Sequence, residues 1–355
     1  MRKNYGAKAL ILLAVFAMVL GGCKKEEKMD VTKASTATEQ KTEASTQDPH
    51  EGKVKSRLSG KWVDEAVGTQ RPIAIMINNI KQAQPQSGIS KADIIYECLV
   101  EGGITRLMAI LENYNGVEKL GSVRSARHYY VEIADEYDAI FAHYGQTKYA
   151  VSEIEKRGID TLSGLSSLGD VIYYRDSNRV APHNAYIDEK GIEKGIEQMK
   201  YRKEYEKGFQ GHFRFYDKNT ALQGEQANKV ILSYSNYTSP YFIYDSDKKL
   251  YERFQYGEPQ IDDQTKEQLT YRNIIVQFVK EWDIDRNGYQ TMDLDSSGKG
   301  YYITMGQYIP ITWEKTKEDG ITHYYTEKGL EIRLNTGKTW VSVFPNDRQQ
   351  GVEFE

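Results

Sequence analysis

Two apolar, β-branched segments flank the dipeptide Gly102-Gly103, and this stretch of the chain, from Ala92 to Leu111, constrains the fold most strongly. Both glycines can adopt a positive φ without steric cost, so a glycine pair between strand-like segments is typical of a two-residue β-hairpin. The sequence therefore predicts an antiparallel pair of strands in which Glu101 faces Ile104 and Leu99 faces Arg106.

The predicted register places the charged side chains of this hairpin on one face. Glu97, Glu101 and Arg106 lie there among apolar residues, and Arg106 is diagonal to both glutamates. Charges on an otherwise apolar face need partners, so we expect either a functional surface or a structural ion-pair network. The two glutamates stand roughly 13 Å apart along the strand, which is too far for the usual pair of catalytic carboxylates.

The N-terminus has the pattern of a secretion signal. Arg2, Lys3 and Lys8 precede an apolar run, 9–20, that is too short to span a bilayer but has the length of a signal-peptide core. The run ends in Leu20-Gly21-Gly22-Cys23, which resembles the signal of bacterial lipoproteins. The resemblance implies that residues 1–22 are removed and that an acylated Cys23 anchors the protein to the lipid bilayer, at the extracytoplasmic face of the cell membrane.

Composition divides the rest of the chain. Residues 23–60 are mostly Lys, Glu, Thr, Ser, Gln and Ala, and we expect a disordered tether because such a segment buries too little apolar surface to fold. We then expect an N-terminal domain over 61–217, a linker over 218–228 and a C-terminal domain over 229–355.

Charge and cysteine content exclude some functions. The net charge is −4, and no basic excess or nucleic-acid-binding motif indicates a nucleic-acid partner. The chain has two cysteines, so an acylated Cys23 leaves Cys98 without a disulfide partner. Cys98 falls on the apolar face of the hairpin, where a free cysteine behaves as a small hydrophobic residue.

Candidate ligand-binding residues follow the hairpin. A helix is predicted to end near Glu136, with Ser122 or Ser125 as its N-cap. Arg124 and Arg127 at this end are unfavourable unless a negative group joins them. That group is either Glu97 or Glu101, or a bound phosphate, sulfate or carboxylate.

Three further candidates lie beyond this helix. His143 ends a predicted strand, 137–143, at the edge where α/β proteins usually bind ligands. The next helix runs to Arg157, with Gly158 as its C-cap. His183 and Asn184 follow Pro182 in a predicted loop, and loops on rigid scaffolds carry much of protein function. We predict no metal and no cofactor, because the histidines are not spaced as a local metal site.

Several motifs together resemble the YerB-type lipoproteins of Gram-positive bacteria. The resemblance rests on motifs in order along the chain, namely Arg71-Pro72, Met76 and Asn78, Pro85-Gln86-Ser87-Gly88, Ala92-Asp93-Ile94, Tyr96-Glu97, Val100 to Arg106, Val123 to Arg127, His143 with Gly145, and Pro182-His183-Asn184. It implies a two-domain lipoprotein of unknown function, and therefore an architecture and a location but no reaction.

The C-terminal domain is predicted to be mostly antiparallel β-structure. Short runs rich in Tyr, Val and Ile alternate with Gly, Asp and Asn. The expected strands are 230–235, 241–245, 250–256, 274–282, 301–305, 309–315, 322–326, 331–334 and 339–344. Residues 283–288 copy the start of a calcium loop, but Leu294 stands where a glutamate belongs, so a hairpin turn is predicted instead.

The predicted fold class is an α+β or α/β N-terminal domain, with a mixed sheet and the glycine hairpin, followed by a mostly antiparallel β-domain. The predicted function is binding of an anionic or glycan ligand in the cell envelope, with the cell-wall polymer as a partner. The residues expected to bind it are Arg106, Arg124, Ser125, Arg127 and Asn184. One alternative is an enzyme that cleaves a wall polymer, using Glu97 or Glu101 with His143 or His183. Another is a structural scaffold with no ligand.

Overall fold

A single eleven-stranded sheet runs through both halves of the protein in the computed structural model, which describes residues 49–315 and 320–355. The predicted signal peptide and Cys23 lie outside these residues. The strands lie in the spatial order β12 (Glu225–Gln226), β22 (Gln307–Lys315), β21 (Ser297–Thr304), β18 (Asn273–Val279), β25 (Thr339–Pro345), β4 (Ile94–Leu99), β5 (Thr105–Leu111), β3 (Ile73–Asn78), β7 (Ile140–His143) and β8 (Thr161–Ser163), and β23 (Thr322–Thr326) pairs with β22.

The two halves of the sequence meet at strands β4 and β25. These strands are parallel, with Ile95 opposite Trp340 and Tyr96 opposite Val341. Every residue of β3, β4, β5, β18 and β25 is buried, as expected for strands covered on both faces. The sheet is mixed on the N-terminal side and mostly antiparallel on the C-terminal side, so the predicted fold class is confirmed.

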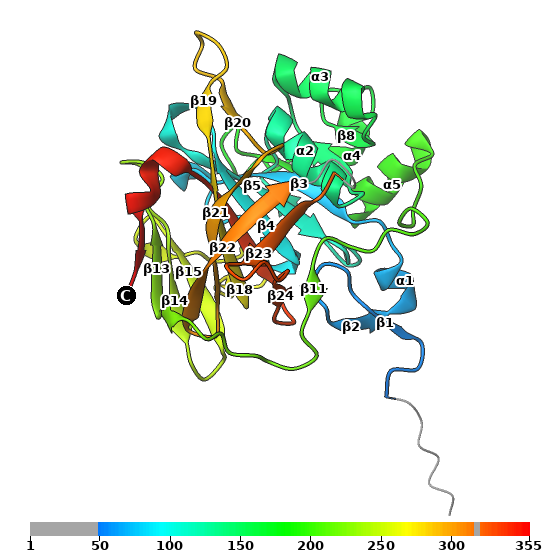
Figure 1. Ribbon diagram of the computed structural model, residues 1–355. Helices are drawn as coiled ribbons and strands as arrows, with labels where there is room; N and C mark the ends of the chain where they lie inside the picture. Colours follow the sequence, from blue (N-terminus) through cyan, green and yellow to red (C-terminus); the bar gives the residue numbers. More distant parts are fainter. Residues whose placement is uncertain (1–48, 316–319) are drawn as a thin grey trace, which may run out of the picture. The chain divides into compact units, whose positions relative to one another are not determined.

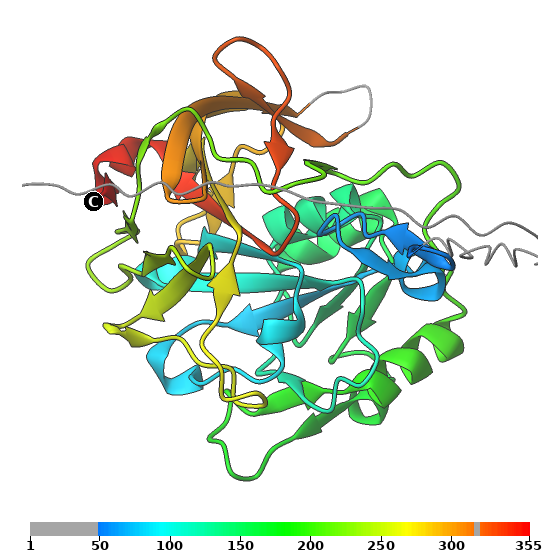
Figure 2. The same ribbon diagram turned by 90° about the horizontal axis from the view of Figure 1, so that it is seen from below.

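Different layers cover the two faces of β4 and β5. On one side lies α2 (His128–Glu136), whose Tyr130 hydroxyl accepts a hydrogen bond from the Cys98 amide. On the other lies a second sheet, in the order β16 (Glu258–Pro259), β15 (Leu250–Gln255), β14 (Tyr241–Asp245), β13 (Lys229–Leu232) and β26 (Val352–Phe354), with β17 (Thr270–Tyr271) paired to β15. Both views place the green helices and the yellow-green strands on different sides of the cyan strands (Figure 1, Figure 2).

Smaller elements complete the described chain. The other helices are α1 (Glu65–Gly68), α3 (Lys148–Arg157), α4 (Gly169–Ile172) and α5 (Glu189–Met199), and the 3₁₀ turns are η1 (Lys81–Ala83), η2 (Ile89–Lys91), η3 (Glu101–Gly103) and η4 (Asn346–Gly351). The small sheets are β1 (Lys53–Lys55) with β2 (Trp62–Asp64), β6 (Leu120–Gly121) with β10 (Ala185–Ile187) and β9 (Tyr173–Arg175), β11 (Arg214–Phe215) with β24 (Arg333–Leu334), and β19 (Glu281–Asp283) with β20 (Gln290–Met292). Within 49–315 and 320–355, no helix is long and apolar enough to cross a bilayer.

Folded structure begins earlier than the predicted boundary at residue 61. Lys53–Lys55 forms β1, and Leu58 is fully buried. Val54 packs against Gly68 of α1, and a Cβ atom added to Gly68 would lie only 2.3 Å from Val54 Cγ2. The C-terminal part of the predicted tether is therefore folded, because its few apolar side chains pack against other parts of the protein.

The glycine hairpin is confirmed, but its predicted register is wrong by one residue. Leu99 lies opposite Thr105 and Cys98 lies opposite Arg106, and the loop of three residues is closed by a hydrogen bond from the Val100 amide to the Ile104 carbonyl. Gly102 and Gly103 both have positive φ, at 75° and 71°. A shift of one residue moves side chains to the other face, so Glu97 and Arg106 point to opposite sides of the sheet.

Other local predictions have mixed outcomes. Helix α2 begins at His128 with Arg127 as its N-cap, so the predicted caps Ser122 and Ser125 are wrong. Helix α3 ends at Arg157 with Gly158 in the left-handed conformation, as predicted. The segment that resembled a calcium loop connects the antiparallel strands β19 and β20, which confirms the predicted hairpin turn.

Candidate functional site

The loop 122–126 inserts between the carboxyl ends of the parallel strands β3 and β7. On one side, the Arg124 amide donates to the Met76 carbonyl at 3.0 Å. On the other, the Tyr144 amide donates to the Arg124 carbonyl at 3.1 Å, and the Ala126 amide donates to the Gly145 carbonyl at 2.9 Å. The strands therefore diverge at the edge of the sheet where α/β proteins usually bind ligands, as expected for His143 at the end of β7.

Gly145 permits this close approach. An ideal Cβ at Gly145 would lie 2.6 Å from Ser125 Oγ, and the residue has a φ of +93°. A side chain at this position would collide with the loop and would also require a strained backbone. The close packing fixes the loop that carries Arg124 and Arg127.

Three arginines converge on this loop. Arg106 of β5 donates from Nη1 to the Ser125 carbonyl, and Arg127 donates from Nη1 to the Ser125 and Ala126 carbonyls. Burial, together with the positive charges of Arg127 and Arg124, lowers the pKa of Arg106 to about 10. Burial and Arg127 also lower the pKa of Arg124. Arg106 and Arg127 donate to the same carbonyl, that of Ser125, so their guanidinium groups lie close together.

One carboxylate in the described ranges pairs with these arginines. Glu101, at the hairpin tip, forms a two-point contact with Arg127, with Oε1 2.8 Å from Arg127 Nε. Burial alone would raise the pKa of Glu101, but the hydrogen bonds and charge of Arg127 hold it below its ordinary value. Glu101, one of the alternatives expected for the negative partner, therefore pairs with Arg127, whereas Arg106 and Arg124 contact backbone carbonyl groups.

Arg124 and His183 lie together at the accessible side of the cluster. Both side chains are partly exposed. Arg124 Nη1 donates to the Pro182 carbonyl at 3.3 Å, while its Nε is buried and has no hydrogen-bond partner among the described residues. His183 Nδ1 lies 2.7 Å from Asn78 Nδ2, and burial together with the charge of Arg124 lowers the pKa of His183. Asn78 ends β3, so this contact ties the loop to the sheet.

His143 is a buried neutral imidazole. Its Nδ1 donates to the Gly145 carbonyl at 2.9 Å, and burial lowers its pKa to about 4. Nε2 therefore carries a lone pair at neutral pH, and it is buried without a partner in 49–315 or 320–355. Such a nitrogen can accept a proton or a hydrogen bond from a ligand.

Glu97 does not belong to this cluster, which corrects the predicted shared face. Both Glu97 and Arg253 of β15 have fully buried side chains, and their charged atoms are 2.9 Å apart. Thr105 and Asn79 also donate to Glu97, while the Arg253 guanidinium lies 4.0 Å from the ring centre of Trp340. Burial raises the pKa of Glu97, and Arg253 opposes that rise. This pair ties the central sheet to the second sheet.

The remaining candidates have structural contacts. Asn184 accepts a hydrogen bond from Arg175, whose guanidinium lies 4.9 Å from the ring centre of Tyr144. Ser125 contributes its carbonyl group to two arginines, and its hydroxyl donates to the Tyr144 carbonyl at 3.4 Å. Cys98 is fully buried, as predicted, and burial raises the pKa of its thiol.

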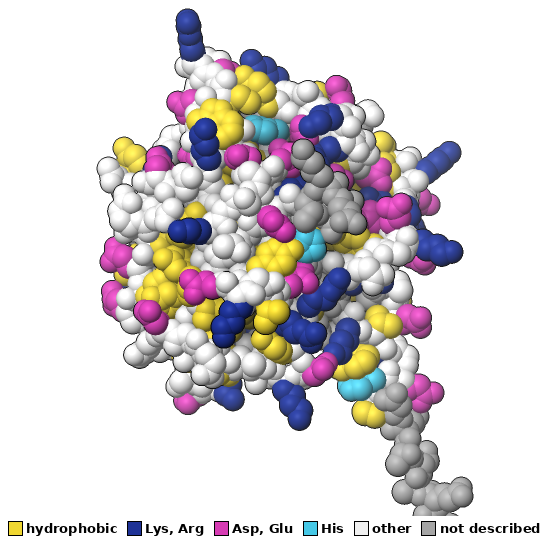
Figure 3. Space-filling model, viewed as in Figure 1, with side chains coloured by type: hydrophobic (Ala, Val, Ile, Leu, Met, Phe, Trp, Pro, Cys, Tyr) yellow, Lys and Arg dark blue, Asp and Glu magenta, His cyan; other side chains and the backbone are white. Residues whose placement is uncertain are grey.

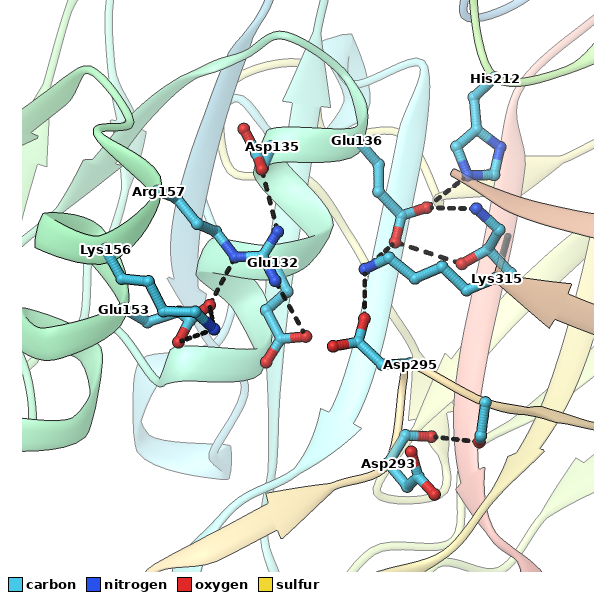
Figure 4. Close-up of polar contacts among 12 residues, drawn as sticks. Glu132, Asp135, Glu136, Glu153, Lys156, Arg157, His212, Asp293, Asp295 and Lys315 are labelled. Carbon is cyan, nitrogen blue, oxygen red and sulfur yellow. Dashed lines mark hydrogen bonds and ion pairs between the residues drawn. The ribbon is translucent and has the colours of Figure 1, made fainter. Parts of the chain in front are cut away.

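A second polar cluster was not predicted from the sequence. Glu136 of α2 accepts hydrogen bonds from His212 Nε2 and the Thr322 amide, each at 2.9 Å, and pairs with Lys315 at 3.1 Å (Figure 4). Asp295 also contacts Lys315. These groups connect α2 to β22 and β23, more than 170 residues away in the sequence, so local patterns gave no signal for them.

A hollow of about 640 Å³ lies on another side of the hairpin tip. Gly102 and Gly103 line it together with residues 233–237, Arg348 and Glu353. None of the three clustered arginines lines this hollow.

Comparison with known proteins identifies relatives that cover most of the chain. Residues 58–202 match the N-terminal domain, and residues 230–341 the C-terminal domain, of the protein family of unknown function DUF3048. The chain is 31% identical over 297 residues to "Putative lipoprotein YerB" of Bacillus subtilis, covering 83% of this chain and 87% of that protein. The crystal structure of Bacillus subtilis YerB is similar with a TM-score of 0.76 and 30% identity, covering 85% of this chain and 99% of that chain.

Proposed function

The chain belongs to the DUF3048 family. We propose that it is a lipid-anchored binding protein of the bacterial cell envelope and that it holds an anionic group at Arg106, Arg124 and Arg127. The ligand is a phosphate- or carboxylate-bearing envelope molecule.

The observation that carries the proposal is the imbalance of charge at the loop 122–126. Among the described residues, one of the three arginines, Arg127, pairs with a carboxylate, and two of the three arginines are almost fully buried. Buried cations normally have charged partners, because carbonyl groups alone replace only part of the lost hydration. An anion beside Arg124 would accept the free Nε–H and offset the repulsion.

Location supports the same reading. The cluster lies beside the N-terminus of α2, whose partial positive charge favours an anion. Partly exposed Arg124 and His183 give a solute access to it. His183 becomes an additional donor if the bound anion raises its pKa.

The proposed anchor rests on the sequence and on the relative's name. Residues 1–23 have the form of a lipoprotein signal ending in Cys23, and the Bacillus subtilis relative is named as a lipoprotein. We propose that acyl chains on Cys23 hold the protein at the outer face of the membrane. Incorporation of labelled fatty acid that disappears in Cys23→Ser tests the anchor separately.

Calorimetric titration of the mature chain with inorganic phosphate and with a phosphate-bearing polyol tests the ligand class. Arg124→Gln should weaken binding roughly tenfold to a hundredfold, since a hydrogen bond to a charged group contributes about 1.5–3 kcal/mol. The control is Arg202→Gln, which removes an arginine paired with Asp138 elsewhere in the protein. No binding to the parent, or equal binding to the parent and Arg124→Gln, would overturn the proposal.

A second candidate is an enzyme acting on a wall polymer, which the lone pair of His143 favours. Nε2 could take a proton from a nucleophile held by the arginines. Glu97 is held in its pair with Arg253, and Arg127 holds the Glu101 carboxylate and lowers its pKa, so the candidate base is His143 Nε2, which has no partner among the described residues. Release of soluble products from wall fragments, lost in His143→Asn but kept in Arg202→Gln, would favour the enzyme over a binding protein or scaffold.

A further inference from the structure

An exposed tryptophan and a group of cations surround a hollow of about 480 Å³ near the start of the described chain. The hollow is lined by Lys55, Lys61, Trp62 and Lys218, with Asp217 as the acid among the lining residues. Trp62 is 44% exposed. The His50 ring stacks on it at a centroid distance of 3.9 Å, and Lys55 Nζ lies 5.7 Å from its centre. The indole is therefore held in place at the surface rather than packed into the core.

Further cations extend this surface. Arg214 of β11 and Arg333 of β24 lie directly opposite each other, and both are exposed. Asp217 pairs with Lys55, which lowers the pKa of Asp217 through a hydrogen bond and its charge. The positive charge of Arg333 lowers this pKa to a smaller extent. Figure 3 shows dark-blue side chains gathered on this face, over the region that Figure 1 labels β2, β11 and β24. The residues that line the hollow and the Arg214–Arg333 pair thus include five cations and one carboxylate, although the whole chain is acidic.

This surface adjoins the end of the chain that leads to the proposed anchor. Cys23 lies 26 residues before Pro49, the first described residue, and even a fully extended chain of that length spans at most about 90 Å. His50, one residue further on, contacts Trp62 directly. The membrane that holds Cys23 is therefore always within reach of this face.

We propose that Trp62 and the surrounding lysines dock the folded part of the protein on anionic lipid headgroups of the membrane that anchors it. This inference rests on the proposed lipid anchor but does not involve the arginine cluster. Tryptophan favours the membrane interface because its ring is apolar while its N–H can remain hydrated. Lysines near an anionic bilayer add electrostatic attraction that decreases with ionic strength.

The test uses the mature chain from residue 23 with Cys23→Ser, so that no acyl chain contributes to binding. The described residues, 49–315 and 320–355, belong to one compact unit, which this chain retains. Sedimentation with vesicles is compared for phosphatidylcholine alone and for phosphatidylcholine mixed with phosphatidylglycerol. We expect binding to the mixed vesicles that is lost at high salt. Lys61→Gln with Lys218→Gln should weaken it about 25-fold, from roughly fivefold for each lysine.

Trp282 provides a matched control for Trp62. It is also 44% exposed and also has a lysine over its ring, Lys280 at 5.4 Å, but it lies on β19, far from β1 and β2 in Figure 1. The other two tryptophans, Trp313 and Trp340, are buried. Brominated lipid should therefore quench fluorescence of the parent and Trp282→Phe, but not of Trp62→Phe.

The outcomes separate this inference from the proposed function. Equal sedimentation with both vesicle types, or equal quenching in Trp62→Phe and the parent, would overturn the docking surface. Phosphate titration of Trp62→Phe should match that of the parent, because the arginine cluster is unchanged. Fatty-acid labelling of Cys23 reports on the anchor alone, so a failed docking test leaves the anchor and the anion site to be judged by their own measurements.

Discussion

Replacing Glu97 by Gln should destabilise the protein strongly, because it leaves the buried guanidinium of Arg253 without a charged partner. Both side chains are fully buried, and the remaining side-chain hydrogen bonds of Arg253 go to the amide oxygens of Gln260 and Gln255, which carry no net charge. Removing one member of a buried ion pair costs about 3–5 kcal/mol. That is a large share of the roughly 5–15 kcal/mol that stabilises a typical folded domain.

Urea unfolding of Glu97→Gln, Arg253→Met and the double variant measures this cost. The double variant should lose less stability than the sum of the single variants, because it removes both buried charges. Glu355→Gln is the control, since the Lys229–Glu355 pair is exposed and should contribute less than about 1 kcal/mol. The reasoning is refuted if the free energy of unfolding of Glu97→Gln lies within about 1 kcal/mol of that of the parent, or if the stability lost in the double variant equals the sum of the losses in the two single variants.

Three further variants test other parts of the structure. Burial raises the pKa of Glu112 from 4.5 to about 7, so the free energy of unfolding of the parent should fall by about 3 kcal/mol as pH rises through this window. Thermal unfolding of Glu112→Gln from pH 4 to 8 should show a weaker dependence of stability on pH, and the same dependence in the variant and the parent would contradict the assignment. Gly145→Ala should weaken phosphate binding by displacing the loop at Ser125, as measured by titration, whereas Gly158→Ala, with no atom near its Cβ, should leave binding intact. His212 and Lys315 hold the pKa of Glu136 below its ordinary value despite burial, so the parent should lose stability below about pH 4.5. Glu136→Gln should lower the free energy of unfolding by about 3–5 kcal/mol at pH 7. A melting temperature equal to that of the parent would show that Glu136 does not stabilise the fold.

Local patterns in the sequence predicted the glycine hairpin, helices α2 and α3, and many strands of the C-terminal half. Strands β14 and β23 have the predicted bounds, and Gly158 ends α3 as its conformational freedom suggested. These features depend on residues close together in the chain. The glycine hairpin was also found, but its loop holds three residues rather than two, and the side-chain pattern could not distinguish these lengths because both faces are largely apolar.

The candidate site required contacts between distant segments. Arg253 lies 156 residues from Glu97 in the sequence. Polar and apolar residues in its strand, Leu250–Gln255, do not show which face of the strand is buried, so no sequence signal identified this pair. Glu101 was one of the expected partners of Arg124 and Arg127, because arginines at a helix N-terminus need a negative group. Convergence of Arg106 with Arg124 and Arg127 was also expected, but on the assumption of a shared face with Glu97 that the register excludes.

The most direct test of the anion site is a crystal structure of the protein grown with tungstate, an anion whose anomalous scattering locates it independently of the surrounding density. We predict a peak within hydrogen-bonding distance of Arg124 Nε, absent in crystals of Arg124→Gln. Tungstate bound elsewhere, with no peak among Arg106, Arg124 and Arg127, would contradict the account.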